Sequence, residues 1–181
     1  MFLYNEVQKR EANQERVRVG LIGAGKFGSM FLSQAPFTIG LEVSSIVDIS
    51  VENAKKNCRD VGWTEEQIES VSFFDNLKKM ISQTKIDVLV EATGDPVEGT
   101  KHALIAIEEG LDIVMVNVEA DVLSGPYLAK EADKAGVVYS MAYGDQPALT
   151  TEIVEWARAS GFKVVAAGKG TKYLPEYHYS T

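Results

Sequence analysis

Short apolar runs alternate with amphipathic stretches along most of the chain. The apolar runs have the length of strands buried in a parallel sheet, and they cover residues 17–22, 41–47, 71–74, 87–91, 112–116, 137–140 and 162–167. Helical patterns lie between them, at residues 26–35, 50–60, 76–83, 96–109, 124–135 and 146–160. This alternation predicts an α/β Rossmann fold, a doubly wound and mostly parallel sheet with helices on both faces.

Polar residues mark several of the helix ends. Thr64 and Gln67 have the spacing of a capping box, so a loop or a short helix is expected around them. Asp75 and Asp145 each precede a helical pattern and are expected to cap it. In the last helical pattern, apolar residues at helical spacing predict one apolar face, made of Leu149, Ile153, Trp156 and Ala157.

The length and composition favour one domain. The chain has 181 residues, of which 45% are hydrophobic, and it shows no internal repeat or low-complexity run. This is enough for one buried core, or for one domain with an appendage. We therefore expect a polar N-terminal arm at residues 1–15, followed by a single dinucleotide-binding domain at residues 16–181.

Charge and cysteine content exclude several functions. The net charge is −8, because 26 acidic residues outnumber 18 basic ones, and an acidic surface disfavours nucleic acid as a partner. Cys58 is the only cysteine, which rules out a disulfide framework and a thiolate zinc site, and we expect no metal. No apolar stretch is long enough to cross a membrane, so a cytoplasmic protein is the default expectation.

A glycine motif follows the first apolar run. Gly23, Gly25 and Gly28, with Lys26 and Phe27 between the last two, form Gly-x-Gly-x-x-Gly between a strand and a helix. The first glycine permits a tight turn, the second lets the backbone approach a pyrophosphate, and the third lets the helix lie close to the strand. The helix N-terminus favours an anion. These five residues are therefore predicted to bind a dinucleotide, against the alternative of a glycine turn that only packs.

An acidic residue completes the motif. Asp48 ends the second strand and lies 48 − 28 = 20 residues after the last glycine, where a carboxylate binds the adenosine ribose. A 2′-phosphate beside it would meet a like charge, with a repulsion of about 4 kcal/mol at ~4 Å and an effective dielectric of ~20. No arginine follows closely, so NAD is favoured over NADP. The alternative is that Asp48 only caps the next helix.

Two further turns follow the fourth and fifth strands. Thr93 and Gly94 end the fourth strand, beside the switch point of a doubly wound sheet, and are expected to line the ribose and nicotinamide side. Asn117 and Glu119 follow the fifth strand and are expected to contact nicotinamide or substrate. A plain turn, and ordinary polarity of a surface loop, are the respective alternatives.

Few residues are candidates for chemistry. Lys169, between two glycines near the end of the chain, is the best candidate for an acid or an electrostatic catalyst, against the alternative of a flexible basic turn. His102 is expected to be exposed in the middle of a helix and is not favoured as a catalyst. Cys58 has basic neighbours that could lower its pKa, but a thiol without a role is favoured.

These segments resemble a known family. The runs 21–28, 90–94 and 116–122, with 125–128, 143–147 and 167–170, resemble the N-terminal NAD(P)-binding domain of the homoserine-dehydrogenase-like oxidoreductases. The similarity is greatest to the branch whose members often carry a C-terminal SAF domain, which includes a deoxyxylulose-phosphate reductoisomerase-like enzyme. It covers roughly residues 16–172. Val118 departs from the family, because homoserine dehydrogenases proper have a lysine there.

The resemblance implies hydride transfer between NAD(P) and a small hydroxy or keto metabolite, phosphorylated ones included. Family members are longer, and their second domain carries substrate contacts and the dimer interface. That domain is expected to be absent from this chain, and a homo-oligomer is left open. Two alternatives remain: a non-catalytic dinucleotide-binding module that needs a partner domain, and an S-adenosylmethionine methyltransferase, which the full glycine spacing disfavours.

Overall fold

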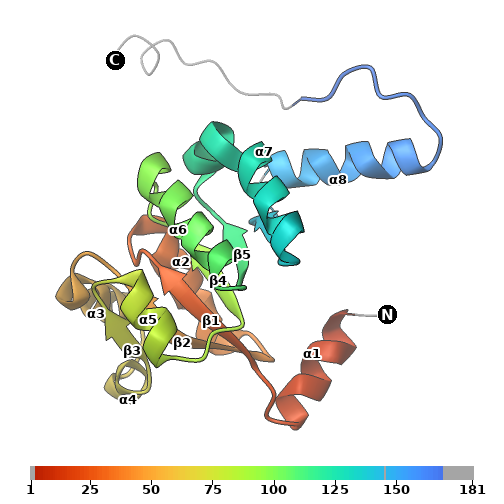
Figure 1. Cartoon of the computed structure of the whole chain (residues 1–181). Coiled ribbons are helices and arrows are strands. Elements are labelled where there is room, and N and C mark those ends of the chain that lie inside the picture. The colour runs from red at the N-terminus through yellow and green to blue at the C-terminus, as the bar shows by residue number, and fades with distance from the viewer. Residues whose placement is uncertain (1–2, 145, 169–181) are drawn as a thin grey trace, which may run out of the picture. The chain divides into compact units, whose positions relative to one another are not determined.

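A six-stranded parallel sheet forms the centre of the protein. The computed structural model describes residues 3–144 and 146–168. The strands lie in the order β3-β2-β1-β4-β5-β6, and all five neighbouring pairs are parallel. Their bounds are Val17–Ile22 (β1), Leu41–Val47 (β2), Ser72–Phe74 (β3), Val88–Glu91 (β4), Asp112–Met115 (β5) and Tyr139–Met141 (β6). Figure 1 shows the helices that connect them. The Rossmann prediction is confirmed.

Helices pack on both faces of this sheet. The helices that follow β1 and β2 are α2 (Lys26–Gln34), with the 3-10 turn η1 (Ala35–Phe37), α3 (Val51–Asp60) and α4 (Glu65–Glu69). They share one core cluster with strand residues such as Val19 and Leu21. The helices α5 (Leu77–Gln83), α6 (Pro96–Glu108) and α7 (Val118–Ala135) share a second cluster with Ile22 and Leu89. Consecutive strand residues therefore point to opposite faces, as a doubly wound sheet requires.

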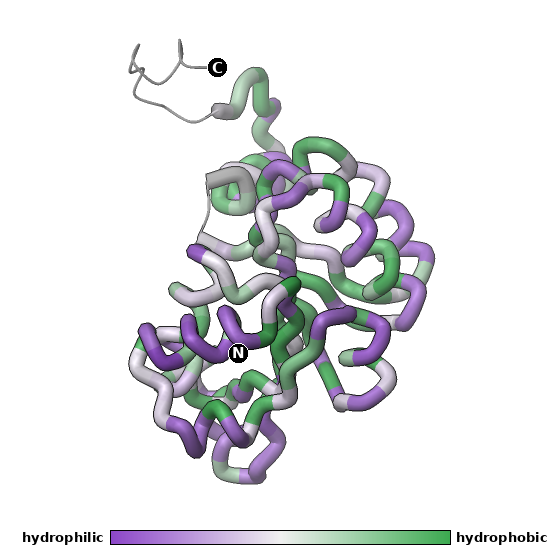
Figure 2. Tube along the Cα trace, turned by 90° about the vertical axis from the view of Figure 1, so that its left-hand side faces the viewer, coloured by the Kyte–Doolittle hydropathy of each residue, from purple (hydrophilic) through white to green (hydrophobic). Residues whose placement is uncertain are grey.

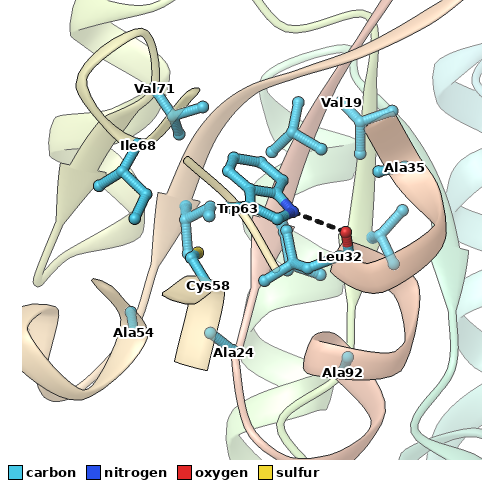
Figure 3. Close-up of a cluster of buried hydrophobic side chains, with 14 residues drawn as sticks. Val19, Ala24, Leu32, Ala35, Ala54, Cys58, Trp63, Ile68, Val71 and Ala92 are labelled. Carbon is cyan, nitrogen blue, oxygen red and sulfur yellow. Dashed lines mark hydrogen bonds between the residues drawn. The ribbon is translucent and has the colours of Figure 1, made fainter. Parts of the chain in front are cut away.

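The first core cluster contains a buried tryptophan, Trp63. Trp63 is buried and its indole Nε1 donates a hydrogen bond to the backbone oxygen of Leu32, at 2.7 Å (Figure 3). Cys58 lies in the same cluster and is fully buried. The indole bond ties α2 to the segment between α3 and α4, because a buried Trp N–H has to find an acceptor.

Some of the helix caps predicted from the sequence are present in the structure, and others are not. Thr64 and Gln67 form the expected capping box of α4, and Ser50 caps α3. Asp75 was expected to cap α5, but Asn76 does so by accepting from the Lys79 backbone N–H. Asp75 instead pairs with the Lys79 side chain at 2.9 Å.

Two element boundaries predicted from the sequence are wrong. Helix α7 begins at Val118 rather than at residue 124, because Asn117 caps it, and Pro126 lies inside the helix. The described residues 162–168 do not form the expected last strand. An apolar run becomes a strand only when it finds a partner to hydrogen-bond with.

The N-terminal arm is largely a helix. Helix α1 (Leu3–Ala12) has no buried residue among those described and appears as the hydrophilic segment next to the N-terminus in Figure 2. The Glu11 carboxylate accepts a hydrogen bond from the Gly40 backbone N–H at 3.0 Å and pairs with Arg16. This arm is therefore attached by polar contacts at its C-terminal end and by the close packing of Val7 on Gly40.

The chain divides into two compact units, one ending at Met141 and the next beginning at Ala142. Helix α8 (Gln146–Ala159) belongs to the second. The apolar face expected on it is largely not covered, since Ile153 is 64% and Trp156 70% exposed. Asp145, its expected cap, lies outside the described residues.

Candidate cofactor-binding site

The glycine motif forms a tight turn between β1 and α2. Gly23 has φ +89°, and a Cβ at this position would lie 3.0 Å from the Thr93 Cα. A Cβ on Gly28 would overlap the Gly23 carbonyl oxygen. The turn therefore needs glycine at both positions, one for its backbone conformation and one for the close approach of α2. These are the structural roles that the spacing predicts.

Gly25 differs from the other two glycines. Outside its two chain neighbours, no described atom lies within 4 Å of the Cβ that an alanine would add there. Gly25 is also the N-cap residue of α2, and no described side chain caps this helix end. The first N–H groups of α2 thus remain open to an anion, which is what a pyrophosphate needs.

Asp48 lies against this turn. Its Oδ2 accepts a hydrogen bond from the Ala24 backbone N–H at 2.9 Å, and its Oδ1 accepts from the Ser50 backbone N–H at 2.9 Å. Asn57, from α3, donates to the Ala24 carbonyl oxygen at 2.8 Å. Asp48 therefore holds the glycine turn in place. It does not cap α3, because Ser50 is the cap residue of that helix. Two backbone donors leave a carboxylate with capacity for further hydrogen bonds.

A cleft of about 830 Å³ opens at the carboxyl edge of the sheet, where the ends of β1, β2 and β4 meet. The predicted site residues that line it are Gly23, Gly25, Lys26, Phe27, Asp48, Thr93 and Gly94. Residues from α5 and α6 line its other side, among them Leu77, Lys78 and Ile105. Such a cleft, with apolar walls and a few convergent polar groups, is typical of a cofactor site. Phe27 is 58% exposed at its edge.

The turn after β4 rests on a buried carboxylate that the sequence analysis did not single out. Glu91, the last residue of β4, is fully buried. Its Oε1 accepts hydrogen bonds from the Thr93 hydroxyl, at 2.5 Å, and from the Thr93 backbone N–H, at 3.4 Å. The His102 Nδ1 lies 3.2 Å from the same oxygen. The only available signal was an acidic residue that ends an apolar run.

The second oxygen of Glu91 has no partner in the part of the chain that the structure describes. Oε2 is buried and makes no hydrogen bond to any described residue. Leaving a buried acceptor unpaired costs about 1–3 kcal/mol, and more for a charged group. Glu91 is therefore a poor choice for stability alone.

Asn117 and Glu119 differ from Thr93 and Gly94 in their position relative to the cleft. Asn117 is 3% exposed, its Oδ1 accepts from the Ala120 backbone N–H, and its Nδ2 donates to the Asp95 carbonyl oxygen at 2.8 Å. Glu119 is exposed in the first turn of α7. Neither is among the described residues that line the cleft. Asn117 thus joins the start of α7 to the turn after β4.

Three residues were considered for catalysis from the sequence: His102, Cys58 and Lys169. His102 was expected to be exposed, but its side chain is only 18% exposed and lies against Glu91, at the wall of the cleft. Burial raises the pKa of the Cys58 thiol to about 11, which opposes the effect of its basic neighbours. Cys58 is therefore a structural thiol. Lys169 lies outside the described residues.

The described helices include none that is long and apolar enough to cross a membrane. A glycine turn with an open helix start, an acidic residue after β2 and a cleft at the switch point define a dinucleotide-binding Rossmann domain.

Family comparisons agree with this class. Residues 19–142 match the family described as "Homoserine dehydrogenase, NAD binding domain", and residues 144–181 match "Oxidoreductase DRL, catalytic domain". The chain belongs to the homoserine dehydrogenase NAD-binding domain family, and the resemblance seen in the sequence is confirmed. It is an NAD-binding domain of the dehydrogenase-like oxidoreductases. No curated protein matches the chain.

Solved structures share the fold. The WlbA dehydrogenase from Bordetella pertussis, in complex with NADH and UDP-GlcNAcA, superposes with a TM-score of 0.60 at 22% identity, over 81% of this chain and 40% of that one. Myo-inositol 2-dehydrogenase from Lactobacillus plantarum gives a TM-score of 0.55 at 14% identity, over 81% and 42%. The chain thus spans about 40% of the length of these neighbours.

Proposed function

We propose that this chain binds NAD(H) in the cleft at the carboxyl edge of its sheet and supplies the cofactor half of an oxidoreductase. The observation that carries the proposal is the open start of α2 at Gly25, which faces the cleft beside Asp48. Gly23, Gly25 and Gly28, with the backbone at Lys26 and Phe27, hold the pyrophosphate, because the N–H groups and the helix dipole favour an anion.

In this arrangement the other polar groups contact different parts of the dinucleotide. Asp48 accepts hydrogen bonds from the adenosine ribose, while Thr93 and Gly94 line the ribose and nicotinamide side. Asn117 acts through the turn that it holds, and Glu119 remains a candidate for contact with the nicotinamide or the substrate. The protein binds and orients the dinucleotide, which itself supplies the hydride chemistry.

The substrate proposed for the complete site is a small hydroxy or keto metabolite, with phosphorylated ones included. Lys169 is the proposed acid or electrostatic residue, on the sequence position alone. The family match of residues 144–181 to an oxidoreductase catalytic domain supports a contribution to chemistry from this end of the chain.

A titration with NADH, followed by fluorescence, tests the proposal. The first variant is Gly25→Ala, because an added Cβ there meets no described atom within 4 Å outside its chain neighbours, and the second is the control Ser33→Ala, at an exposed position of α2. In the first variant the methyl group lies where the pyrophosphate approaches, so we expect affinity to fall about tenfold or more, the equivalent of about 1.4 kcal/mol. The second should bind like the unchanged chain. Equal affinity of the two variants, or no binding of NADH at millimolar concentration, would contradict the proposal.

The preference for NAD over NADP rests on the charge of Asp48. We expect NADH to bind more tightly than NADPH, and Asp48→Asn to narrow this difference, because the amide removes the repulsion of the 2′-phosphate. Parallel titrations with both cofactors measure the ratio of affinities. A ratio that Asp48→Asn leaves unchanged would show that another group sets the preference.

A second candidate function is dinucleotide binding without turnover. It is favoured by one observation: Asp48, Thr93 and His102, which line the cleft, each already make a hydrogen bond to another described residue. An assay of hydride transfer by this chain alone, with and without added hydroxy and keto acids, separates the two functions, since turnover would exclude the second.

A further inference from the structure

The turn that follows β4 is fixed from three sides. The Thr93 hydroxyl and N–H reach down to the Oε1 of Glu91, and the Asn117 amide holds the Asp95 carbonyl oxygen from the side. Asp95 in turn caps α6, with its Oδ1 accepting from the N–H groups of Val97 and Glu98 at 2.9 and 2.8 Å. Gly94, between Thr93 and Asp95, has φ +78°.

Helix α6 leaves room for the carboxylate. A Cβ on Gly99 would lie 3.2 Å from the Oε2 of Glu91 and 2.5 Å from the Nδ2 of Asn117. The absence of a side chain at Gly99 therefore lets both polar groups pack against the helix. A second side chain, His102, comes from the same helix and meets Oε1 through Nδ1. A carboxylate that accepts this bond favours the tautomer with its hydrogen on Nδ1.

The fold thus retains a buried carboxylate, one oxygen of which is unpaired among the described residues, and arranges two helices around it. A buried charge is weak evidence for stability, since well-packed apolar residues often replace such groups without loss. Glu91 is also too deeply buried to touch a ligand. Its observable effect is on Thr93, which is exposed and lines the cleft.

We propose that Glu91 is a positioning residue for the cofactor: its carboxylate fixes the Thr93–Asp95 turn, and thereby the part of the cleft that takes the nicotinamide half of the dinucleotide. This inference rests on the proposed function. The inference predicts that Glu91 affects only one half of the cleft. The glycine turn and Asp48 hold the pyrophosphate and the adenosine side, and among the described residues neither makes a hydrogen bond to Glu91.

The test compares NADH with ADP-ribose, which lacks the nicotinamide. Glu91→Leu removes the acceptor, and Glu91→Gln keeps an oxygen for Thr93. Loss of one such hydrogen bond corresponds to about fivefold in affinity. We therefore expect Glu91→Leu to weaken NADH binding about fivefold or more and ADP-ribose binding less than about twofold, with Glu91→Gln restoring most of the NADH affinity. Glu108→Gln, which changes an exposed glutamate of α6, is the control for the Glu-to-Gln change and should alter neither affinity.

Three other outcomes would contradict the inference. Equal losses for both ligands in Glu91→Leu would mean general damage to the site, and unchanged binding of both would mean no role; either result overturns the inference and leaves the proposed function standing. An unchanged chain that binds neither ligand overturns both proposals.

A second pair of variants covers the case in which Glu91→Leu does not fold. Thr93→Val removes the hydroxyl that Glu91 accepts, while Thr93→Ser retains it. We expect the valine variant to lower the ratio of NADH to ADP-ribose affinity and the serine variant to preserve it. In the double variant Glu91→Leu, Thr93→Val, the loss should be smaller than the sum of the two single losses, because both changes break the bond between the Thr93 hydroxyl and the Glu91 Oε1. Additive losses would overturn the inference.

Discussion

Helices α2 and α6, which follow the neighbouring strands β1 and β4, start at the same edge of the sheet, but their N-termini differ. Helix α2 starts at Gly25 with no described side chain on its N-terminal N–H groups, whereas Asp95 occupies two N–H groups at the start of α6. One start is left open toward the cleft and the other is closed. The difference shows how one sheet edge can provide an anion site and, next to it, a rigid turn.

The glycines in the two helix starts differ in the same way. Gly28 in α2 packs against backbone, namely the Gly23 carbonyl oxygen, while Gly99 in α6 packs mainly against the side chains of Asn117, Ala120 and Glu91. Backbone at a tight turn cannot move away, but side chains can shift. The glycine turn is thus the more demanding of the two packings.

The largest expected effect follows from this contrast. Gly28→Ala should destabilise the protein by about 3 kcal/mol, at the upper end for overpacking, and Gly99→Ala by about 1 kcal/mol, because its neighbours can relax. Denaturation in urea measures both. Ser33→Ala, at an exposed position of α2, is the control. A greater loss from Gly99→Ala than from Gly28→Ala would reverse the comparison.

The smallest expected effect concerns the cap of α6. Asp95→Ala removes the acceptor for the Val97 and Glu98 N–H groups and should cost about 1 kcal/mol of unfolding free energy. Asp75→Ala is the control: Asp75 is exposed and caps no described helix, and an exposed ion pair with Lys79 contributes little, within about 0.5 kcal/mol. Equal costs for the two variants would show that the closed start of α6 adds no stability.

Much of the fold was predictable because its signals are local. The apolar runs at β1 and β2 match the strands of the structure to the residue, and the Thr64–Gln67 spacing gave the capping box. The secondary-structure predictions were wrong where the structure of a segment depends on residues far away in the sequence. The run at 162–167 has apolar residues of the right kind, but no described strand pairs with it.

The site was predictable to a similar extent. The tight turn at Gly23 and the close packing at Gly28 were predictable, because Gly-x-Gly-x-x-Gly between a strand and a helix is typical of such a turn. His102 was expected in solvent because nothing in a helical pattern reveals which face meets a carboxylate from a strand eleven residues earlier. Asn117 was predicted to contact the nicotinamide or the substrate. Its roles as a cap and as a brace for Asp95 could not be predicted, since they depend on α7 beginning at Val118.

The sequence by itself determined the order of strands and helices, the glycine turn after β1 and the acidic residue after β2, because hydrophobic period, chain stiffness and residue spacing act over short distances. Only the tertiary structure decided that Glu91 is buried beneath the Thr93–Asp95 turn, with His102 and Asn117 brought to it from α6 and the start of α7. Burial and hydrogen-bond partners are properties of packed neighbours, and parallel crossovers bring together residues that are far apart in the chain.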